Sequence, residues 1–574
     1  MKILMIDLTT GKTSERALPD PLMGGRWLTS TLVSDLVDPK TDPLGAGNVL
    51  VLACGALAGR RVSTGGRLSV GAKSPLTGGI KEANAGGMAG DSLAALGYRA
   101  LVFTGACPAG KPAVAVLDEN GVRLEDASPF WGMPNNEADL GLRQRFGEQF
   151  VCVSIGPAGE KKMKAAGIAV TDANDNPFRL AARGGLGAVM GAKGLKAVLV
   201  ERIGRQNLNE GKDARSRVAE FNKLVATNER VVTMRAFGTA STVMPVQKLG
   251  GLPTRNYSEG SFEGVESISG ETMRELTLAR GGVGTPTEAC MSGCVIQCSN
   301  LFPKPDGTLA AGPIEFETLG LCGSNLGLDS LDEIAELNRL CNDLGLDTID
   351  VGAALGVMME VAAEGSAPPP YDQMDLPRFG DGKRAAAVLA EIYTGGPLGE
   401  LVGNGVVATG AALGARHVPA VKGQALSAYD PRVIKGTGVT YCTTPQGADH
   451  TAGLTLYSPV EHTDASTAVA ASRATQIQRA AYDSLGLCVF NISAAGRQPE
   501  FLLNMLRSAY NADLPDDWLD ITGLKVIRME RDFNRAAGMT AADDRLPAYF
   551  MTEVLSPRGT VFDVPEAELD AMWN

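Results

Sequence analysis

Short apolar runs separated by glycine-rich turns make up the first 205 residues of the chain. Runs of roughly four to eight residues that are bounded by glycine and rich in branched or aromatic side chains are typical of β-strands. Such runs predict strands at 2–6, 49–52, 68–71, 100–104, 113–117, 151–155 and 197–200. We therefore expect residues 1–205 to form a β-rich domain.

From about residue 206 the apolar positions recur at helical spacing. Ser330 and Glu333 form a capping box, and the apolar residues that follow lie on one helical face until Gly345 ends the helix. Further helices are expected at 348–365, 465–484, 499–510 and 526–536, with a proline-rich linker at 366–382. The chain is thus expected to be an α+β protein. The β-rich domain at 1–205 would precede two mainly helical domains, at 206–410 and 411–574.

Composition and charge narrow the range of functions. Hydrophobic residues make up 44% and charged residues 21% of the 574, and the net charge of −12 argues against nucleic acid as a partner. No apolar run approaches the roughly 20 residues that span a bilayer, and the first residues resemble a strand and not a signal peptide. We expect a cytoplasmic protein with no membrane partner. Its ten cysteines would then be free, metal-bound or redox-active.

Three of these cysteines, Cys290, Cys294 and Cys298, fall within nine residues. Thiolates gathered in this way suit an iron–sulfur cluster or zinc, and both normally need a fourth ligand. On a straight helix the outer two would lie about 12 Å apart at about 1.5 Å per residue, so a metal site requires a bend, which Gly293 permits. The alternative is three buried cysteines on one face of a helix.

Two predicted helix ends resemble each other, one at 342–347 and the other at 483–488. Each places polar residues around a glycine that terminates a helix, and a carboxylate there can accept two hydrogen bonds from a heterocycle with adjacent N–H donors. Alone, each is an ordinary helix cap. As a pair they indicate two equivalent binding loops, and the second would bring Cys488 as a fourth thiolate.

Glycine-rich stretches occur at 63–67, 73–79, 84–87 and 183–191. Such stretches let backbone N–H groups approach phosphates, with arginine and lysine adding charge. The alternative is that they are simply turns of a β-rich domain. No GxGxxG motif follows a clear strand, which argues against a Rossmann nucleotide site.

Together, these motifs resemble the tungsten- and molybdenum-dependent aldehyde:ferredoxin oxidoreductase family. The resemblance covers nearly the whole chain, from the opening strand and turn at 2–11 through the stretches at 73–79 and 183–191 to the cysteines and both helix ends. It implies two metallopterins that hold one tungsten or molybdenum, a nearby 4Fe–4S cluster, and magnesium that bridges the pterin phosphates.

The resemblance also implies roles for individual residues. The cluster ligands would be Cys290, Cys294, Cys298 and Cys488. The first pterin loop would contribute Asn342, Leu346 and Asp347, and the second Asp483 and Leu487. The remaining cofactor contacts would come from Arg67, Asn84, Gly86, Ala182, Arg183, Gly184 and Lys422.

Proton chemistry near the metal needs a titratable pair, and the resemblance points to Glu317 and His450. Glu315 is close enough in sequence to exchange roles with Glu317. The other two histidines, His417 and His462, have no assigned role.

The chain departs from the family pattern in three places. The cysteine spacing is CxxxCxxxC and not CxxCxxxC, Asn342 replaces a common aspartate, and Arg339 replaces the histidine of an ExxH interface-metal motif. A homodimer would therefore lack an interface iron.

The function expected is interconversion of an aldehyde and a carboxylic acid, with electrons leaving through the cluster to ferredoxin or an iron–sulfur partner subunit. Two alternatives remain open. One is a radical S-adenosylmethionine enzyme, although its usual CxxxCxxC spacing is absent; the other is a zinc-stabilised binding protein without enzymatic activity. The sequence does not determine whether the metal is tungsten or molybdenum, and it does not identify the substrate.

Overall fold

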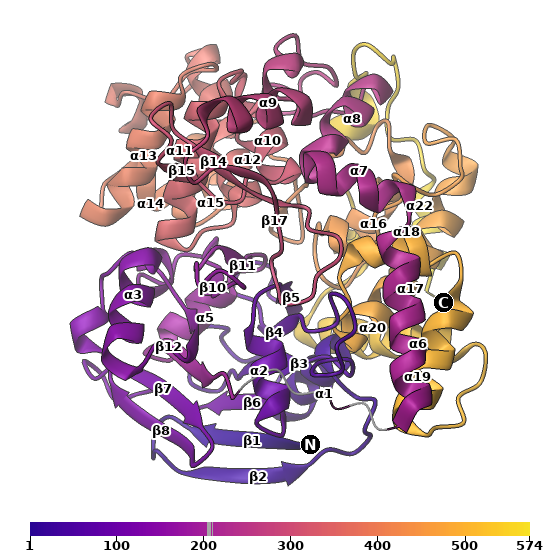
Figure 1. Cartoon of the computed structure of the whole chain (residues 1–574). Helices are drawn as coiled ribbons and strands as arrows, with labels where there is room; N and C mark the ends of the chain where they lie inside the picture. The colour runs from indigo at the N-terminus through magenta and orange to yellow at the C-terminus, as the bar shows by residue number, and fades with distance from the viewer. Residues whose placement is uncertain (204–207, 209–210, 574) are drawn as a thin grey trace.

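A computed structural model describes residues 1–203, 208 and 211–573. The first 201 residues form two six-stranded sheets, in the orders β2-β1-β6-β3-β4-β5 and β8-β7-β12-β9-β10-β11 (Figure 1). The first sheet contains β1 Lys2–Asp7, β2 Thr13–Ala17, β3 Leu50–Cys54, β4 Leu68–Lys73, β5 Ile80–Ala85 and β6 Tyr98–Thr104. The second contains β7 Ala113–Asp118, β8 Gly121–Asp126, β9 Phe150–Ser154, β10 Ile168–Val170, β11 Arg179–Ala181 and β12 Leu195–Glu201.

The two sheets are repeats of one topology, because adding six to each strand number of the first order gives the second. In each sheet the first and last strands pair in parallel, β1 with β6 and β7 with β12, and all other pairs are antiparallel. The helices repeat as well: α1 (Gly25–Leu36) and α3 (Asn135–Phe146) precede the third strand of their sheets, and α2 (Ala89–Ala95) and α5 (Leu186–Ala192) precede the last.

One apolar core lies between the two sheets and includes residues of α2 and α5. A second core covers the other face of the first sheet, where α1 and α20 (Trp518–Ala537) pack. The other face of the second sheet packs against α3. The N-terminal part is therefore a layered structure whose outer layer is completed by a helix from the far end of the chain.

The expected α+β class is confirmed, and the seven predicted strands are present with small shifts at their ends. The sequence analysis missed β2, β5, β8, β10 and β11. Strands β2 and β8 lie at sheet edges and carry few buried side chains, and β10 and β11 are three residues long. Strand β5 buries Lys81 and Glu82, so its polar sequence gave no apolar run to detect.

The predicted helices are also present. Ser330 Oγ accepts a hydrogen bond from the Glu333 N–H at the start of α11 (Leu331–Leu344), and Gly345 ends it with φ +75°. Helices α12 (Thr348–Glu364), α17 (Ala465–Leu485) and α19 (Pro499–Tyr510) agree with expectation, whereas α20 begins well before residue 526. The other helices of four or more residues are α4 Pro157–Glu160, α6 Gly211–Ala226, α7 Glu229–Phe237, α8 Val243–Leu249, α9 Gly270–Arg280, α10 Phe316–Leu321, α13 Gly382–Thr394, α14 Pro397–Gly403, α15 Val406–Leu413, α16 Lys435–Thr443, α18 Ile492–Ala495, α21 Tyr549–Thr552 and α22 Glu566–Ala571.

Short strands complete the helical part. Three of them form a small sheet, and two more form a hairpin. They are β13 Thr285–Glu288, β14 Ser299–Pro303, β15 Leu309–Ala311, β16 Ala420–Val421 and β17 Gln424–Ala425. In the described part of the chain, no helix is long and apolar enough to cross a membrane.

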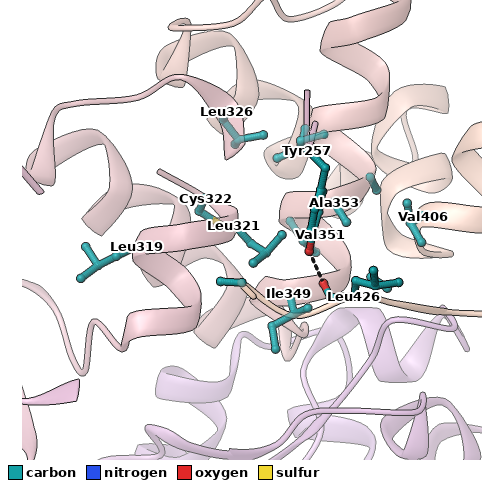
Figure 2. Close-up of a cluster of buried hydrophobic side chains, with 14 of the residues drawn as sticks. Tyr257, Leu319, Leu321, Cys322, Leu326, Ile349, Val351, Ala353, Val406 and Leu426 are labelled. Atoms are coloured by element: carbon teal, nitrogen blue, oxygen red, sulfur yellow. Dashed lines mark hydrogen bonds between the residues drawn. The ribbon is translucent and has the colours of Figure 1, made fainter. Parts of the chain in front are cut away.

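The packing crosses the predicted domain boundary at residue 410. One continuous core joins residues such as Tyr257, Leu319 and Val351 to Leu426 and Phe550 (Figure 2). Helix α6, early in the helical part, packs against α19 near the end of the chain (Figure 1). The predicted divisions at 205 and 410 stay predictions. The first lies where the chain changes from strands to helices. At the second, the packing is continuous.

A buried ion pair joins α1 to α20. Arg26 Nε and Nη2 donate to the two carboxylate oxygens of Glu530 at 2.9 and 2.8 Å, and Ser30 Oγ donates to Glu530 at 2.7 Å. The two charged side chains are at most 2% exposed. Arg26 also lies 3.5 Å from Asp483, and Glu530 and Asp483 raise its pKa despite burial.

Replacing Glu530 by glutamine should reduce the free energy of unfolding by about 3 kcal/mol, because removing one partner leaves an incompletely compensated buried charge. The measurement is equilibrium or thermal denaturation of the purified protein. The matched control is Asp532→Asn on the same helix, whose pair with Arg535 is exposed; its loss should be below about 1 kcal/mol. Equal losses in the two variants would contradict the expected role of the Arg26–Glu530 pair.

Candidate active site

Two adjoining cavities of about 270 and 320 Å³ lie where the first sheet meets the helical part. Their walls share Arg67, Glu315, Glu317 and His450. The first cavity is lined mainly by polar side chains from the two sheets and the two helix ends. The second is lined by cysteines and by aromatic side chains.

The two predicted loops line the first cavity together and have the same backbone geometry. Gly345 and Gly486 both adopt a left-handed conformation, with φ +75° and +76°. The next residue closes each helix end, since Leu346 N donates to Cys341 O at 2.8 Å and Leu487 N donates to Tyr482 O at 3.0 Å. The side chains that reach this cavity from the loops belong to Asn342, Leu346, Asp347 and Asp483.

Each half of the β-repeat supports one of these loops through a glycine. Gly55 follows β3 and lies against the second loop, where a Cβ atom would come 2.2 Å from Gly486 N. Gly156 follows β9 and lies against the first loop, where a Cβ atom would come 2.4 Å from Leu344 O. The sequence analysis missed both glycines; their signal was a glycine just beyond a buried strand in each half.

Asp347 and Arg183 meet beside the first loop. Asp347 Oδ1 caps α12 by accepting from Ile349 N at 3.0 Å, while Oδ2 lies 3.3 Å from Arg183 Nε. Arg183 also donates to Ser427 Oγ and to Ala425 O. Next to it, Ala182 lines the cavity.

The second loop is held by side chains of the first sheet. Asn84 Nδ2 lies 3.5 Å from Asp483 Oδ1, and Arg67 Nη2 donates to Asn84 O at 3.0 Å. Burial raises the pKa of Asp483, although Arg26 and Arg67 oppose that shift. These contacts hold the Asp483 carboxylate at the wall of the first cavity, with its oxygens directed to Asn84 and Arg26, which lie outside the second loop.

The sequence analysis did not identify a buried lysine, Lys81, that lies next to the first cavity. Lys81 Nζ lies 2.6 Å from Asp449 Oδ2, and its aliphatic stem packs under Gly184, where a Cβ would come 2.5 Å from Lys81 Cγ. Lys81 and Arg183 keep the pKa of Asp449 well below its ordinary value against the effect of burial. The residue before His450 is therefore held as a carboxylate.

The cysteine segment bends as a metal site requires. Residues 289–298 form turns and no helix, with φ +75° at Gly293 and +53° at Gln297, so the alternative of three cysteines on one helical face is wrong. Cys290, Cys298 and Cys488 line the second cavity.

Cys294 is buried beside Cys290. The hydrogen bond from Cys294, with Arg179 and Arg67 nearby, lowers the pKa of Cys290 to about 6 despite burial. Gly86 permits a close approach to this thiol, because a Cβ there would come 2.9 Å from Cys290 Sγ.

Three of the four thiols, those of Cys290, Cys298 and Cys488, line one cavity, and the fourth, Cys294, lies beside Cys290. Among the residues that the structure describes, no group of three or more His, Cys, Asp or Glu side chains is arranged to hold a single ion. A four-iron cluster, with sulfur ligands spread over its corners, suits this arrangement better than zinc, whose four ligands lie about 2.0–2.3 Å from one centre.

Glu317 and His450 lie next to each other in the wall that the two cavities share. His450 Nε2 lies 3.3 Å from Glu317 Oε1, Ser427 Oγ bonds His450 Nδ1 at 2.9 Å, and Ala428 N donates to Glu317 Oε2 at 2.8 Å. Burial raises the pKa of Glu317, against the lowering effects of His450, the Ala428 N–H and Arg183.

Glu315 points elsewhere. It accepts from the Thr239 hydroxyl, and Arg179 Nη1 lies 3.8 Å from its carboxylate. His417 lies between Glu360 and Glu553, and does not line either of the two adjoining cavities. The geometry therefore favours Glu317 over Glu315 as the partner of His450.

Lys422 is the predicted cofactor contact that the structure separates from the others. Its ammonium group lies 2.5 Å from Asp544 and faces a different cavity, lined also by Arg531 and Asn534. Gly423, the next residue, approaches the backbone of Leu76, which accounts for the local pattern without a cofactor. The expected contact with the cofactor is therefore not supported by this structure.

Two of the three departures from the family pattern have visible consequences. Asn342 Nδ2 donates to Gly312 O at 2.9 Å while its side chain lines the first cavity. Arg339 binds Glu336 and Asp343 on its own helix, at 2.7 and 2.8 Å. A homodimer without interface iron stays a prediction.

Some buried polar atoms next to the first cavity have no hydrogen-bond partner. Among the described residues they include Glu82 Oε1, Gln424 Oε1 and Gln446 Nε2. In the cavity wall, Arg183 Nε and Asp347 Oδ2 lie 3.3 Å apart without forming a hydrogen bond, as do His450 Nε2 and Glu317 Oε1. An unsatisfied buried polar atom costs about 1–3 kcal/mol, so these atoms fit a site that receives a ligand with polar edges. Carboxylate acceptors at two loops and guanidinium donors between them fit a pair of heterocycles that carry anionic groups.

Comparisons with known proteins agree with this arrangement. The N-terminal domain of aldehyde ferredoxin oxidoreductase matches residues 3–202, and domains 2 and 3 of the same family match residues 216–574. The tungsten-containing aldehyde ferredoxin oxidoreductases of Thermococcus kodakarensis and Pyrococcus furiosus are each 32% identical over 97% of this chain and 92% of their own length.

More distant relatives share the fold. The aliphatic sulfonate oxidoreductase, WOR-like subunit, of Pyrococcus furiosus is 26% identical over 92% of this chain and 85% of its own. The active-site complex BamBC of benzoyl coenzyme A reductase superposes with a TM-score of 0.78 at 19% identity, over 95% of this chain and 90% of that one. This last likeness bears on the fold alone. With both parts of the chain matched, the protein belongs to the aldehyde ferredoxin oxidoreductase family of oxidoreductases.

Proposed function

We propose that the protein interconverts an aldehyde and a carboxylic acid at a tungsten or molybdenum centre held by two metallopterins. The observation that carries this proposal is the first cavity, which two matching helix-end loops line together with Glu317 and His450. The 32% identical relatives are named as tungsten-containing, which supports a tungsten or molybdenum centre without deciding between the two metals.

Residues in and next to the first cavity would hold the cofactor. Asn342, Leu346 and Asp347 would contact one pterin, and Asp483 and Leu487 the other. Asn84 and the Ala182 carbonyl would contribute magnesium ligands next to Gly86 and Gly184, while Arg67 and Arg183 would add positive charge opposite the pterin phosphates. Lys422 is not included, because its side chain faces another cavity.

The four cysteines would hold a 4Fe–4S cluster in the second cavity. Arg67 lies between the two sites, since it lines both cavities. Burial raises the pKa values of Cys488 and Asp483, and the Arg67 charge opposes that rise; it also contributes to the lowered pKa of Cys290. A cluster held there would supply one-electron transfer toward ferredoxin or an iron–sulfur partner subunit.

The hydrogen bonds around His450 define its role. Arg183 donates to Ser427 Oγ, and the Ser427 hydroxyl is hydrogen-bonded to His450 Nδ1. In the imidazole tautomer in which Nδ1 accepts the Ser427 proton, the ring proton lies on Nε2 and faces Glu317 Oε1. Glu317 would accept a proton from water or return one, and His450 would orient the substrate oxygen. The bound metal would supply the two-electron chemistry.

The part of the second cavity that the cysteines do not line would supply the approach for a small aldehyde or acid. Its wall carries aromatic and apolar side chains next to the Glu317–His450 pair, which limits the water that surrounds the reacting group. These lining residues include Phe178, Phe316, Tyr429, Tyr457 and Phe490.

Glu317→Gln should leave the metal content unchanged and reduce kcat by at least about 10²-fold, because the amide cannot take up a proton. Steady-state assays with a panel of aldehydes and an artificial electron acceptor measure the loss. The control is Glu315→Gln, which keeps the Glu317–His450 pair and should cost less. Wild-type turnover in Glu317→Gln would remove this carboxylate from the mechanism.

The pH profile should report the buried environment of Glu317. Because burial raises its pKa, the carboxylate forms at higher pH than in an ordinary glutamate, whose pKa is about 4.3. The value of kcat/KM should therefore fall on the acidic side with a midpoint above that pH. A midpoint at or below the ordinary value would contradict the assignment of Glu317 as the proton acceptor.

Cys488→Ser should lower the iron content from about four atoms per chain while tungsten or molybdenum stays bound, since the thiolate belongs to the cluster alone. Elemental analysis of anaerobically purified protein measures this, and Cys442→Ser, a buried cysteine of α16 outside both cavities, is the control. The same analysis separates the alternatives. Iron alone would favour a radical enzyme, and zinc alone a binding protein; both would contradict the proposal.

A further inference from the structure

The geometry of Glu317 and His450 is set by one short segment, residues 425–429. Within it, the Ala428 N–H binds Glu317 at 2.8 Å and the Ser427 hydroxyl binds His450 at 2.9 Å. Tyr429 adds a ring contact, with its centroid 5.8 Å from that of His450. A shift of this backbone would therefore move both members of the pair at once.

Tyr257 fixes this segment from the side opposite the active site. Its buried hydroxyl lies 2.9 Å from Leu426 O, the hydrogen bond drawn in Figure 2, and 2.7 Å from Ser427 O. Its single proton is therefore shared between two consecutive carbonyl groups. Tyr441 also reaches Ser427 O, at the longer distance of 3.3 Å. Since the carbonyl groups point to Tyr257, the Ala428 N–H is directed away from it, to Glu317.

Tyr257 is itself held in an unusual backbone conformation. Arg255, Asn256 and Tyr257 have φ values of +45°, +55° and +60°, three consecutive non-glycine residues in the left-handed region. Such residues are unfavourable unless their surroundings impose the conformation.

Hydrogen bonds from neighbouring elements impose that conformation. Asn256 N donates to Asn325 O at 3.1 Å, Tyr257 N donates to Asn325 Oδ1 at 3.2 Å, and Arg432 donates to Tyr257 O. Strained residues of this kind cluster at functional sites, where the strain fixes a side chain in one position. Here the residue that the strained turn presents is Tyr257.

We propose that Tyr257 is a positioning residue for catalysis, which holds residues 426–428 so that the Ala428 N–H and the Ser427 hydroxyl orient Glu317 and His450. The inference rests on the proposed function, because it requires these two side chains to perform the proton chemistry. It adds a residue that contacts neither cavity and acts only through the backbone that it binds.

Tyr257→Phe tests the inference, since it removes one oxygen and keeps the ring packing. In the anaerobically purified holoenzyme we expect unchanged iron and tungsten or molybdenum, a fall in kcat of about tenfold or more, and little change in KM. The acidic midpoint of kcat/KM should move to higher pH, because the Ala428 N–H that lowers the pKa of Glu317 is no longer held in place. Hydrogen exchange should increase in a peptide covering 424–430.

Tyr549→Phe is the matched control. Tyr549 belongs to the same aromatic cluster, with its ring 4.2 Å from that of Phe550, and Phe550 contacts Tyr257. Its buried hydroxyl has no hydrogen-bond partner among the described residues. This variant should keep the wild-type kcat, pH profile and exchange rates. Tyr441→Phe should shift all three in the same direction as Tyr257→Phe, but less.

The possible results separate this inference from the proposed function. If Glu317→Gln retains turnover, the proposed function fails, whatever Tyr257 does. If Glu317→Gln is inactive but Tyr257→Phe keeps the wild-type kcat, pH midpoint and exchange of 424–430, the positioning role is overturned. The role is also overturned if Tyr257→Phe and Tyr549→Phe lose activity equally. Tyr257→Phe should cause a smaller fold-loss in a Glu317→Gln background than in the wild type, because part of its effect acts through Glu317.

Discussion

The close approach of two glycines to two helix ends is the constraint on which the rest of the structure depends. Gly55 lies against the turn at Gly486 and Gly156 against the turn at Gly345, at distances that leave no room for a Cβ atom. Each turn is thereby fixed to one half of a repeated β-structure. As a result, two loops more than a hundred residues apart in the sequence line one cavity and present Asp347 and Asp483 to it.

Charge is buried at this centre in an ordered way. Asp483 lies beside Arg26 and Asn84, Asp347 beside Arg183, and Asp449 beside Lys81. Burying these charges is costly unless each has an opposite charge or strong hydrogen bonds. The partners nevertheless leave several polar atoms unsatisfied around the first cavity, which suits a site completed by a polar, anionic cofactor.

The Glu317–His450 pair is connected to the two helix-end loops by polar contacts. Arg183 contacts Asp347 of the first loop and also donates to Ser427, whose hydroxyl binds His450. Tyr257 binds the same backbone at the Leu426 carbonyl group, as Figure 2 shows, and at that of Ser427. The cavity wall that carries Glu317 and His450 is therefore continuous with the structure that holds the first loop.

The sequence by itself determined the fold class, seven strands of the two large sheets, several of the longer helices and the residues that resemble the family motifs, because periodicity, glycine turns and thiol spacing are local signals. Only the tertiary structure decided that the cysteine segment bends, that Lys422 pairs with Asp544 away from the centre, and that Glu317 and not Glu315 faces His450. It also decided that Lys81, Tyr257 and the two supporting glycines lie next to the residues of the site. Strand β5 shows the reason: its buried Lys81 looks like a surface residue in the sequence, since Asp449, the partner that makes its burial possible, lies 368 residues further along the chain.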